Sequence, residues 1–271
     1  FQWIAGKGNL QKKPVYRPTV TSKVPVIKPK AKKKNILFVV CDDLNTHVSS
    51  SGYKNISTPN LTRLADESIT FNRAFCQYPV CGPSRASFLS GLYPQSTGIL
   101  NNTFDIRKTR PGTVSMPQFF KENGYWTAGV GKVFHNTKSD HGEMAWHENM
   151  RFENEELGIV REARLKFEAK NGSIEKQPNK KKWKEIKKQV SAKLNAQTPP
   201  GKGRSGLTDA QHKEGKNARQ VVRWLEDKDY GNQPFFIALG FQKPHVPFLA
   251  PDKYFDLYSF DKISYKTDRP N

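Results

Sequence analysis

Two uninterrupted apolar runs stand out along the chain. The first, NILFVVC, covers residues 35–41, and the second, PFFIALGF, covers residues 234–241. Runs of this length without a polar interruption are typical of strands buried on both faces of a parallel sheet. A third strand is predicted over residues 125–130, directly after a helical segment, SMPQFFKEN, that Gly124 ends.

Helical periodicity fills the segments between these predicted strands. In STPNLTRLADESI, Thr58 stands at the N-cap and Pro59 at the first helical position. A further helix is predicted within PSRASFLSGLYP, ending near Gly91. The apolar face of the first of these helices is made by Leu61, Leu64 and Ile69.

A third helical segment, TDAQHKEGKNARQVVRWLEDK, precedes the second apolar run. Thr208 and Gln211 have the spacing of a capping box. The repeated order of strand, helix and strand predicts an α/β fold with a mixed, mostly parallel central sheet flanked by helices. The apolar face of this segment is predicted to be Ala218, Val221, Val222 and Leu225.

Length and composition set broad limits on the class of protein. With 271 residues, 35% of them hydrophobic, the chain can bury a core that needs no disulfides. Three cysteines are too few for a disulfide framework. No apolar run reaches the roughly 18 residues of a membrane span, so no span is expected. Because the first residue is Phe1 rather than methionine, we expect that any signal peptide has been removed or left out.

The net charge of +20 is concentrated in two segments. Residues 1–34 carry nine lysines and one arginine without an acid, and residues 161–216 carry sixteen basic and six acidic residues. We therefore expect a basic, extended N-terminal arm over residues 1–34 and a basic insertion over residues 161–207 within a body of residues 35–271. Such segments are usually solvated surfaces, but they also attract polyanions such as nucleic acid, anionic lipid or sulfated polysaccharide. Specific nucleic-acid binding is not expected, because no nucleic-acid fold signature is present.

Candidate chemistry lies where the predicted strands end. Asp42 and Asp43 follow the first strand, and the ends of parallel strands are where ligands bind in α/β sheets. Two adjacent carboxylates repel each other unless a cation lies between them, and a hard divalent ion would serve. A turn or helix cap would use the same pair of residues without any metal.

Two pairs of lysine and histidine occupy comparable positions. Lys132 and His135 follow the strand at residues 125–130, and Lys243 and His245 follow the second apolar run. An ammonium beside an imidazole lowers the histidine pKa and attracts an anionic ester group. Taken singly, each histidine is more often a surface or core residue than a catalyst.

The stretch CGPSR begins with Cys81, which could be a small buried hydrophobe, half of a disulfide, a thiolate nucleophile or the precursor of another group. The stretch CGPSRASFLSGLYP resembles the Cys-x-Pro-Ser-Arg signature of type I sulfatases. The segments NILFVVCDDLN, TPNLTRLADESITFNRAFCQYPVCGPSR, GYWTAGVGKVFH and PFFIALGFQKPHVPF are similar to the iduronate-2-sulfatase branch. The resemblance covers about residues 35–135 and 208–260.

The resemblance implies a catalytic domain of the alkaline phosphatase and sulfatase fold, acting on sulfate esters of a carbohydrate such as a sulfated polysaccharide. It implies that a formylglycine-generating maturation enzyme oxidises Cys81 to an aldehyde. The hydrated aldehyde carries two hydroxyls, of which one attacks sulfur and the other later expels sulfate. Arg85 is implied as its charge partner.

The resemblance also implies roles for the strand-end residues. Asp42 and Asp43 would bind Ca²⁺ together with position 81, and the metal would polarise a sulfate oxygen. Lys132 would hold the sulfate, and His135 would take the proton that releases it. His245 is implied as the general acid. Lys243 is implied as a neighbouring cation that binds the substrate.

Family members are about twice as long as this chain, so we expect the body to be the N-terminal part of the usual domain. The remaining calcium ligands and a second sulfate-binding lysine would lie in a C-terminal part or a second polypeptide. The resemblance implies a periplasmic or secreted enzyme, or a lysosomal one in a eukaryote. Two alternatives stay open: a phosphonate or phosphate ester hydrolase of the same superfamily, and a noncatalytic polyanion-binding protein.

Overall fold

The computed structural model describes residues 33–135, 142–196, 201–259, 261 and 263. The elements lie in a unit that runs from Lys34 to Asn271. The basic arm predicted at residues 1–34 lies outside the described residues apart from its last two. That prediction therefore stays untested.

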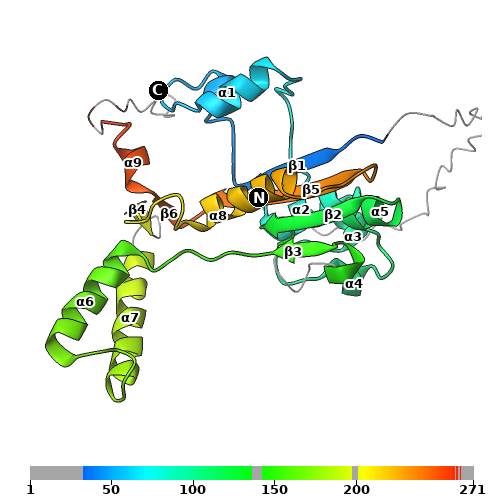
Figure 1. Ribbon diagram of the computed structural model, residues 1–271. Helices are drawn as coiled ribbons and strands as arrows, with labels where there is room; N and C mark the ends of the chain where they lie inside the picture. Colours follow the sequence, from blue (N-terminus) through cyan, green and yellow to red (C-terminus); the bar gives the residue numbers. More distant parts are fainter. Residues whose placement is uncertain (1–32, 136–141, 197–200, 260, 262, 264–271) are drawn as a thin grey trace, which may run out of the picture. The chain divides into compact units, whose positions relative to one another are not determined.

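A four-stranded sheet forms the centre of the unit. Its strands are β1 (Ile36–Asp42), β5 (Phe235–Pro244), β2 (Trp126–Gly131) and β3 (Glu148–Met150), and they lie side by side in that order (Figure 1). All three pairings are parallel. The predicted α/β fold with a largely parallel central sheet is confirmed, and the three longer strands lie where the apolar runs predicted them.

The two faces of β5 pack against different layers of helices. Phe236 and Ala238 face a cluster that includes residues of α2 (Cys81–Ser90) and α5 (Met116–Glu122). Ile237 and Leu239 face the opposite side and pack with Val221 and Trp224 of α8 (Lys213–Glu226). This alternation of side chains is the period of two expected for a strand between two helical layers. The core therefore lies on both sides of β5 and β2.

Strand β1 departs from the prediction that it is buried on both faces. Leu37 and Val39 are each 48% exposed, while the alternate residues Ile36, Phe38 and Val40 are partly buried. The physical reason is position: β1 is an edge strand of the described sheet, and only one of its faces packs on the aromatic cluster of Phe88 and its neighbours.

Helix α8 begins later than the capping-box spacing predicted. The Thr208 backbone N–H does donate to Gln211 Oε1 at 3.0 Å, but this bond closes a turn, and the N-cap of α8 is His212. The predicted apolar face is also partly wrong. Val222 and Leu225 are 45% and 42% exposed, and the residues that α8 buries are Asn217, Val221 and Trp224.

Helix α1 (Pro59–Asp66) has Thr58 at its N-cap position and proline at its first position, as predicted. Its apolar residues are not buried: Leu64 is 61% exposed, and Ile69 lies beyond the end of the helix. Helix α2 ends at Ser90 and Gly91 follows in the left-handed conformation, as the sequence predicted, but the helix already begins at Cys81.

The predicted basic insertion contains a pair of helices, α6 (Gly158–Asn171) and α7 (Asn179–Asn195). They pack on each other through a small cluster of Val160, Phe167 and Trp183. We call α6 and α7 the helical hairpin.

The remaining elements are short. No helix among the described residues is long and apolar enough to cross a membrane. A second, two-stranded parallel sheet pairs β4 (Lys202–Arg204) with β6 (Phe248–Ala250). The short elements are η1 (Ser49–Ser51), α3 (Pro94–Thr97), α4 (Ile106–Thr109), η2 (Gly142–Met144), β4 (Lys202–Arg204), β6 (Phe248–Ala250) and α9 (Asp252–Phe255).

Candidate active site at the strand ends

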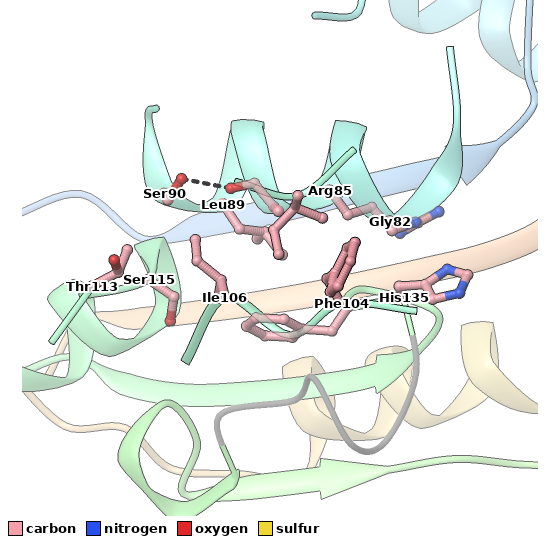
Figure 2. Close-up of a pocket in the computed structure, with 12 residues that line it drawn as sticks. Gly82, Arg85, Leu89, Ser90, Phe104, Ile106, Thr113, Ser115 and His135 are labelled. Atoms are coloured by element: carbon pink, nitrogen blue, oxygen red, sulfur yellow. Dashed lines mark hydrogen bonds between the residues drawn. The ribbon is translucent and has the colours of Figure 1, made fainter. Parts of the chain in front are cut away.

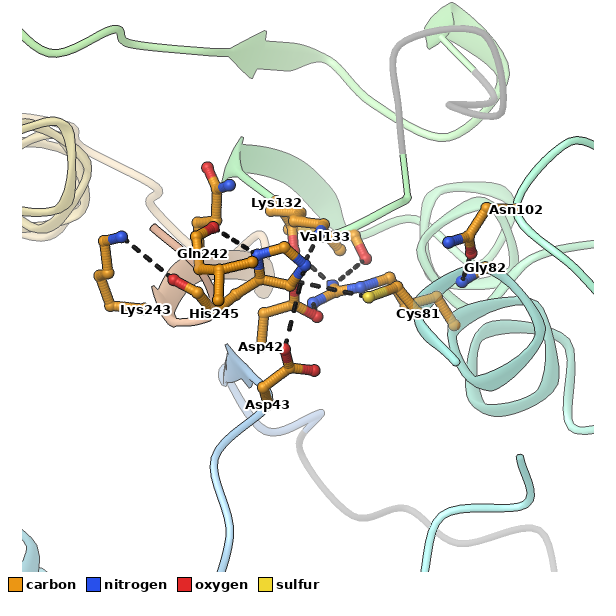
Figure 3. Close-up of polar contacts among 12 residues, drawn as sticks. Asp42, Asp43, Cys81, Gly82, Asn102, Lys132, Val133, Gln242, Lys243 and His245 are labelled. Carbon is orange, nitrogen blue, oxygen red and sulfur yellow. Dashed lines mark hydrogen bonds and ion pairs between the residues drawn. The ribbon is translucent and has the colours of Figure 1, made fainter. Parts of the chain in front are cut away.

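Asp42 is the centre of a polar cluster at the carboxyl end of β1 (Figure 3). The residue is only 4% exposed. Its Oδ1 accepts a hydrogen bond from Arg85 Nη2 at 2.8 Å, and its Oδ2 is paired with the ammonium of Lys132. A β-bulge between Cys41 and Asp42 shifts the register against β5, so Asp42 lies opposite Pro244.

Arg85 joins helix α2 to the end of β2. Its Nη1 donates to the carbonyl oxygen of Val133 at 2.8 Å and also to that of Lys132. Burial by itself would raise the pKa of the Asp42 carboxyl, but hydrogen bonds from Arg85 and Lys132 outweigh it and hold that pKa below its ordinary value. Asp42 is therefore a carboxylate held between two cations.

Cys81 is the first residue of α2, and its Sγ lies 3.7 Å from Asp42 Oδ2. The next N–H of the helix, that of Gly82, donates to Asn102 Oδ1 at 2.7 Å. A Cβ at position 82 would lie 2.8 Å from that same oxygen and 3.2 Å from the backbone of Asn101 and Asn102, so a larger residue would displace the Asn102 side chain. The start of a helix also offers partial positive charge to an anion near Cys81.

Burial raises the pKa of the Cys81 thiol, and the carboxylates of Asp42 and Asp43 add to this effect against the opposing charge of Lys132. The unmodified side chain is therefore a protonated thiol at neutral pH. None of the three cysteines forms a disulfide. The sequence leaves four roles open for Cys81. The absence of a disulfide and the raised pKa of the thiol disfavour two of them, half of a disulfide and a thiolate nucleophile.

His245 closes the cluster from the loop after β5. Its Nδ1 lies 2.6 Å from the carbonyl oxygen of Val246, and its Nε2 lies 3.9 Å from Asp43 Oδ2. Because a carbonyl oxygen only accepts, Nδ1 carries the hydrogen, and Nε2 is the atom that can gain or lose a proton. Asp43 adopts a left-handed backbone with φ of 61°, which aspartate tolerates better than most residues.

Ligand atoms of Asp42, Cys81 and His245 all lie within 4.8 Å of one another. A hard divalent cation takes six or more oxygen ligands, mainly from carboxylates, carbonyls and water. The carboxylates of Asp42 and Asp43 are of the ligand type that such an ion takes, and they would supply part of its coordination. Lys132 is paired with one of the Asp42 oxygens that the ion would use.

His135 lies beside the cluster, and its buried Nδ1 has no hydrogen-bond partner among the described residues. Burial lowers the pKa of this ring, and the charges of Lys132 and Arg85 lower it further. Figure 2 shows His135 at one end of a pocket that also contains Leu89, Ile106 and Ser115. That pocket measures about 30 Å³, room for a single water molecule, so it is too small to hold a substrate.

Lys243 is not brought into the cluster. Its ammonium donates to the carbonyl oxygens of His245 at 3.1 Å and of Pro247, within its own loop. Burial lowers the pKa of Lys243 to about 8, and the neighbouring charge of Lys213 acts in the same direction. In this structure the side chain supports the loop that carries His245.

Comparison with known proteins decides the family. The sequence model of the Sulfatase family matches residues 34–268. The chain belongs to the sulfatase family. Among curated sulfatases, it is 34% identical to a sulfatase of Formosa agariphila over 88% of this chain and 45% of that protein. It is 33% identical to mouse iduronate 2-sulfatase over 86% of this chain and 39% of that protein, so it spans less than half the length of these relatives.

Solved structures show the same fold. The sulfatase chain matches a crystal structure of Ps i-CgsB in complex with k-i-k-neocarrahexaose, with a TM-score of 0.56 and 23% identity over 84% of this chain and 50% of that chain. It also matches the phosphonate monoester hydrolase of Agrobacterium radiobacter, with a TM-score of 0.57 and 16% identity over 84% of this chain and 44% of that chain. The expected resemblance to sulfatases and their α/β fold is confirmed.

Sequence reasoning missed several residues that shape the sulfatase site. Asn102 fixes the start of α2, although nothing in its local sequence marks it. Glu214 Oε2 accepts from the Gln242 backbone N–H at 3.1 Å, and Lys213 binds the Gln242 side chain. These two residues tie the start of α8 to the loop of His245. The mixed-charge sequence at the start of α8, KEGK, carries no motif that would reveal this contact.

Proposed function

We propose that this chain carries the nucleophile-bearing part of a catalytic domain that hydrolyses sulfate esters on a carbohydrate, such as a sulfated polysaccharide or its oligosaccharides. One observation carries the proposal. In a member of the sulfatase family, the end of β1, the start of α2 and the segments after β2 and β5 gather Asp42, Cys81, Arg85, Lys132 and His245 at the carboxyl ends of the strands.

Position 81 is the proposed nucleophile after conversion of Cys81 to formylglycine. As a thiol with a raised pKa, the unmodified side chain is a poor nucleophile at neutral pH. The modified residue supplies a hydrated aldehyde whose hydroxyl is the nucleophile toward sulfur. Its position at the start of α2 directs the partial positive charge of the helix toward the sulfate.

The cationic side chains bind and orient the ester. Lys132 contributes an ammonium at the edge of the cluster, and its partial exposure, 15% of the side chain, lets it turn toward a substrate. Arg85 is nearly buried and fixed by Asp42 and two carbonyls, so its role is to hold the end of β2 against α2. His135 is the proposed acceptor of the proton that is lost when sulfate is released.

His245 is the proposed general acid for the departing sugar oxygen. The carbonyl of Val246 fixes the hydrogen on Nδ1, so Nε2 is directed at Asp43 and the cluster. The protonated ring would donate from Nε2 to the sugar oxygen. Lys243 keeps the loop in place through its two carbonyl contacts and adds positive charge nearby.

Asp42 and Asp43 are the proposed ligands of a divalent cation, Ca²⁺, together with position 81. When bound, the metal supplies Lewis-acid polarisation of a sulfate oxygen. Asp42 would then exchange its contact with the Lys132 ammonium for the metal. The further ligands would come from outside the described residues, from a C-terminal part of the domain or a second polypeptide.

The carbohydrate substrate is supported by the names of the similar proteins and by the basic charge of the chain. Iduronate 2-sulfatase and the structure with a neocarrahexaose both refer to sugars. We further propose a formylglycine-generating enzyme as the maturation partner. An enzyme acting on such polysaccharides would be exported, to a periplasm, to the cell surface or medium, or to a lysosome.

The test is the mass of the tryptic peptide of residues 74–85, AFCQYPVCGPSR, from protein made in its native host. We expect Cys81 alone to have become the lighter aldehyde, with Cys76 as an internal unmodified thiol. Two intact cysteines would overturn the mechanism and favour the noncatalytic polyanion-binding reading. Turnover of an aryl sulfate against an aryl phosphonate then separates a sulfatase from a phosphonate ester hydrolase.

A further inference from the structure

A second cavity lies beside the strand-end cluster and is much larger than the pocket of Figure 2. Its volume is about 230 Å³. It opens between the end of β2, the end of β5 and the first two turns of α8. Its lining includes Lys132, Arg151, Lys213, Glu214, Asn217 and Gln242.

Unsatisfied polar atoms are concentrated in this cavity. Five buried side-chain nitrogen or oxygen atoms lack a hydrogen-bond partner in the described part of the chain, and three of them belong to residues that line it. These are His135 Nδ1, Glu214 Oε1 and Asn217 Oδ1. Buried polar atoms without partners are rare in native proteins, so a cluster of them around one cavity indicates that an occupant completes their hydrogen bonds.

Asn217 is held firmly in the wall. It is 2% exposed, and a Cβ at the neighbouring Gly131, where φ is 77°, would lie 2.6 Å from Asn217 Nδ2. The amide is therefore packed against the end of β2, and Oδ1 keeps its unused acceptor capacity. Such a residue cannot turn to solvent for a hydrogen bond.

Glu214 is anchored in a similar way. Its Oε2 accepts from the Gln242 backbone at 3.1 Å, whereas its buried Oε1 has no partner among the described residues, and Glu214 lines the cavity. Burial raises the pKa of this carboxyl, against the opposing charges of Lys213 and Lys243. A carboxyl in this setting is suited to exchange hydrogen bonds with neutral hydroxyl groups.

The composition of the walls narrows the class of occupant. Lys132, Arg151 and Lys213 all line the cavity, which disfavours a metal cation, and the polar lining disfavours an apolar ligand. The unpaired oxygens of Glu214 and Asn217 require hydrogen-bond donors. A ligand with several hydroxyls and an anionic substituent matches both the hydrogen-bond acceptors and the cationic side chains of the lining.

We propose that this cavity is a subsite for a sugar residue of the sulfated carbohydrate, with hydroxyl groups donating to Asn217 Oδ1 and Glu214 Oε1. The proposal rests on the proposed function and names the part of the substrate that this wall recognises. A water molecule occupies about 30 Å³ in the liquid, so the cavity exceeds the need of one ordered water and accommodates a sugar ring. Lys132 and His135 belong both to this cavity and to the proposed sulfate site, so the subsite is contiguous with the reacting ester.

The test compares two substrates on the native full-length enzyme. We expect Glu214→Gln and Asn217→Leu each to lower kcat/KM about tenfold for a sulfated oligosaccharide, the loss expected for one hydrogen bond to a buried or charged group. For Asn217→Leu, turnover of a small aryl sulfate, which has no second sugar residue, should change less than about twofold. For Glu214→Gln, whose Oε2 also holds the Gln242 backbone, the loss on the oligosaccharide should exceed the loss on the aryl sulfate. Glu226→Gln, on the exposed side of the same helix, is the matched control and should change neither substrate.

Equal losses on both substrates, or no loss on either, would overturn the subsite and leave a water-filled structural cavity. A second measurement separates this outcome from failure of the proposed function. Calorimetry with the Cys81→Ala protein measures binding of the desulfated oligosaccharide without any turnover. Weaker binding after Glu214→Gln supports the subsite even if the wild-type protein hydrolyses no sulfate ester, and unchanged binding contradicts it.

Discussion

The strand-end cluster and the helical hairpin use charge in opposite ways. In the cluster, Asp42 and Arg85 have side chains 5% and 4% exposed, and they come from positions 43 residues apart in the sequence. In the hairpin, the pair of Lys166 and Glu162 is 76% and 67% exposed and lies one helical turn apart. In the cluster, Arg85 and Lys132 each form an ion pair with Asp42. In contrast, α7 carries many lysines and a single acid, Glu185.

This difference teaches where each charge can act. A buried charge depends on its partner, since losing the partner leaves an ion that neither water nor protein stabilises. Exposed lysines interact weakly with neighbours, and they act on distant anions through a field that salt screens. The cluster is therefore expected to control stability and chemistry together, and the hairpin to influence only the approach of a polyanion.

The largest expected effect is loss of the buried pair. Arg85→Met leaves Asp42 with Lys132 as its cationic partner and removes the donor from the carbonyls of Lys132 and Val133, and it should cost about 3–5 kcal/mol of unfolding free energy. It should also abolish turnover of a sulfate ester. Urea unfolding and an aryl sulfate assay measure the two effects.

The matched control is Arg107→Met, because Arg107 pairs with Asp105 at 2.7 Å with 37% and 16% of the two side chains exposed. This substitution should cost about 0–1 kcal/mol and leave turnover unchanged. Equal costs for the two arginines would contradict the view that burial distinguishes them.

The next effect is confined to the hairpin. Trp183 is 7% exposed and packs with Val160 and Phe167, away from the two core clusters of the sheet. Trp183→Ala should cost about 3 kcal/mol of local stability and open the hairpin to trypsin, which cleaves after its many lysines. Aryl sulfate turnover should stay within about twofold of wild type, and a parallel loss of turnover would show that the hairpin and the active site unfold together.

A smaller effect concerns the exposed lysines of α7. Lys181, Lys184 and Lys188 lie three and four residues apart, so they share one side of the helix. Changing all three to glutamine should weaken binding of a sulfated polysaccharide about threefold to tenfold at low salt. The difference should vanish at high salt, since the interaction is screened, and Lys166→Gln, already paired with Glu162, should have no such effect.

Persistence of the difference at high salt would instead indicate direct, desolvated contacts. A nucleic acid of equal charge, used as a competitor, tests whether the surface prefers sulfated sugar or any polyanion. Competition at equal concentration would place the selectivity in the active site rather than in the hairpin.

Much of the sheet could be predicted because its signal is local. The apolar runs of β1 and β5 are continuous, and glycine stops such as Gly91 and Gly124 mark helix ends. The start of α8 could not be placed, because the Thr208 and Gln211 pair makes its bond in a turn rather than at the helix cap. The exposure of Leu37 was also out of reach, since it depends on what lies beside β1 rather than on its own residues.

The same distinction between local and long-range signals holds for the residues of the candidate site. Asp42, Cys81 and Lys132 stand in recognisable motifs, and the structure gathers them as the resemblance implied, although their catalytic roles remain predictions. Asn102 and Glu214 lie 20 and 28 residues from the groups they contact. Their contribution arises only when the chain folds, because no spacing within the sequence encodes it.

The smallest expected effect is an acid sensitivity that belongs to the sheet and not to the hairpin, which contains no histidine. His212 is 3% exposed, and burial lowers its pKa, with the charges of Lys243 and Lys213 adding to burial and Asp209 opposing it. The ring is therefore neutral in the folded protein, whereas an unfolded histidine takes a proton near pH 6.5. Because the unfolded chain binds more protons below that pH, stability should fall as the pH drops from about 6.5 toward the folded pKa.

His212→Gln should remove this part of the acid sensitivity. Between pH 7.5 and 5.5, the urea midpoint of the wild-type protein should fall further than that of the variant, while His47→Gln, an exposed ring, should follow the wild type. The tryptic cleavage rate of the hairpin should not change over the same range. A rise in cleavage that parallels the loss of stability in the sheet would show that the two regions unfold as one cooperative unit. The two regions would then differ in their use of charge but not in their unfolding.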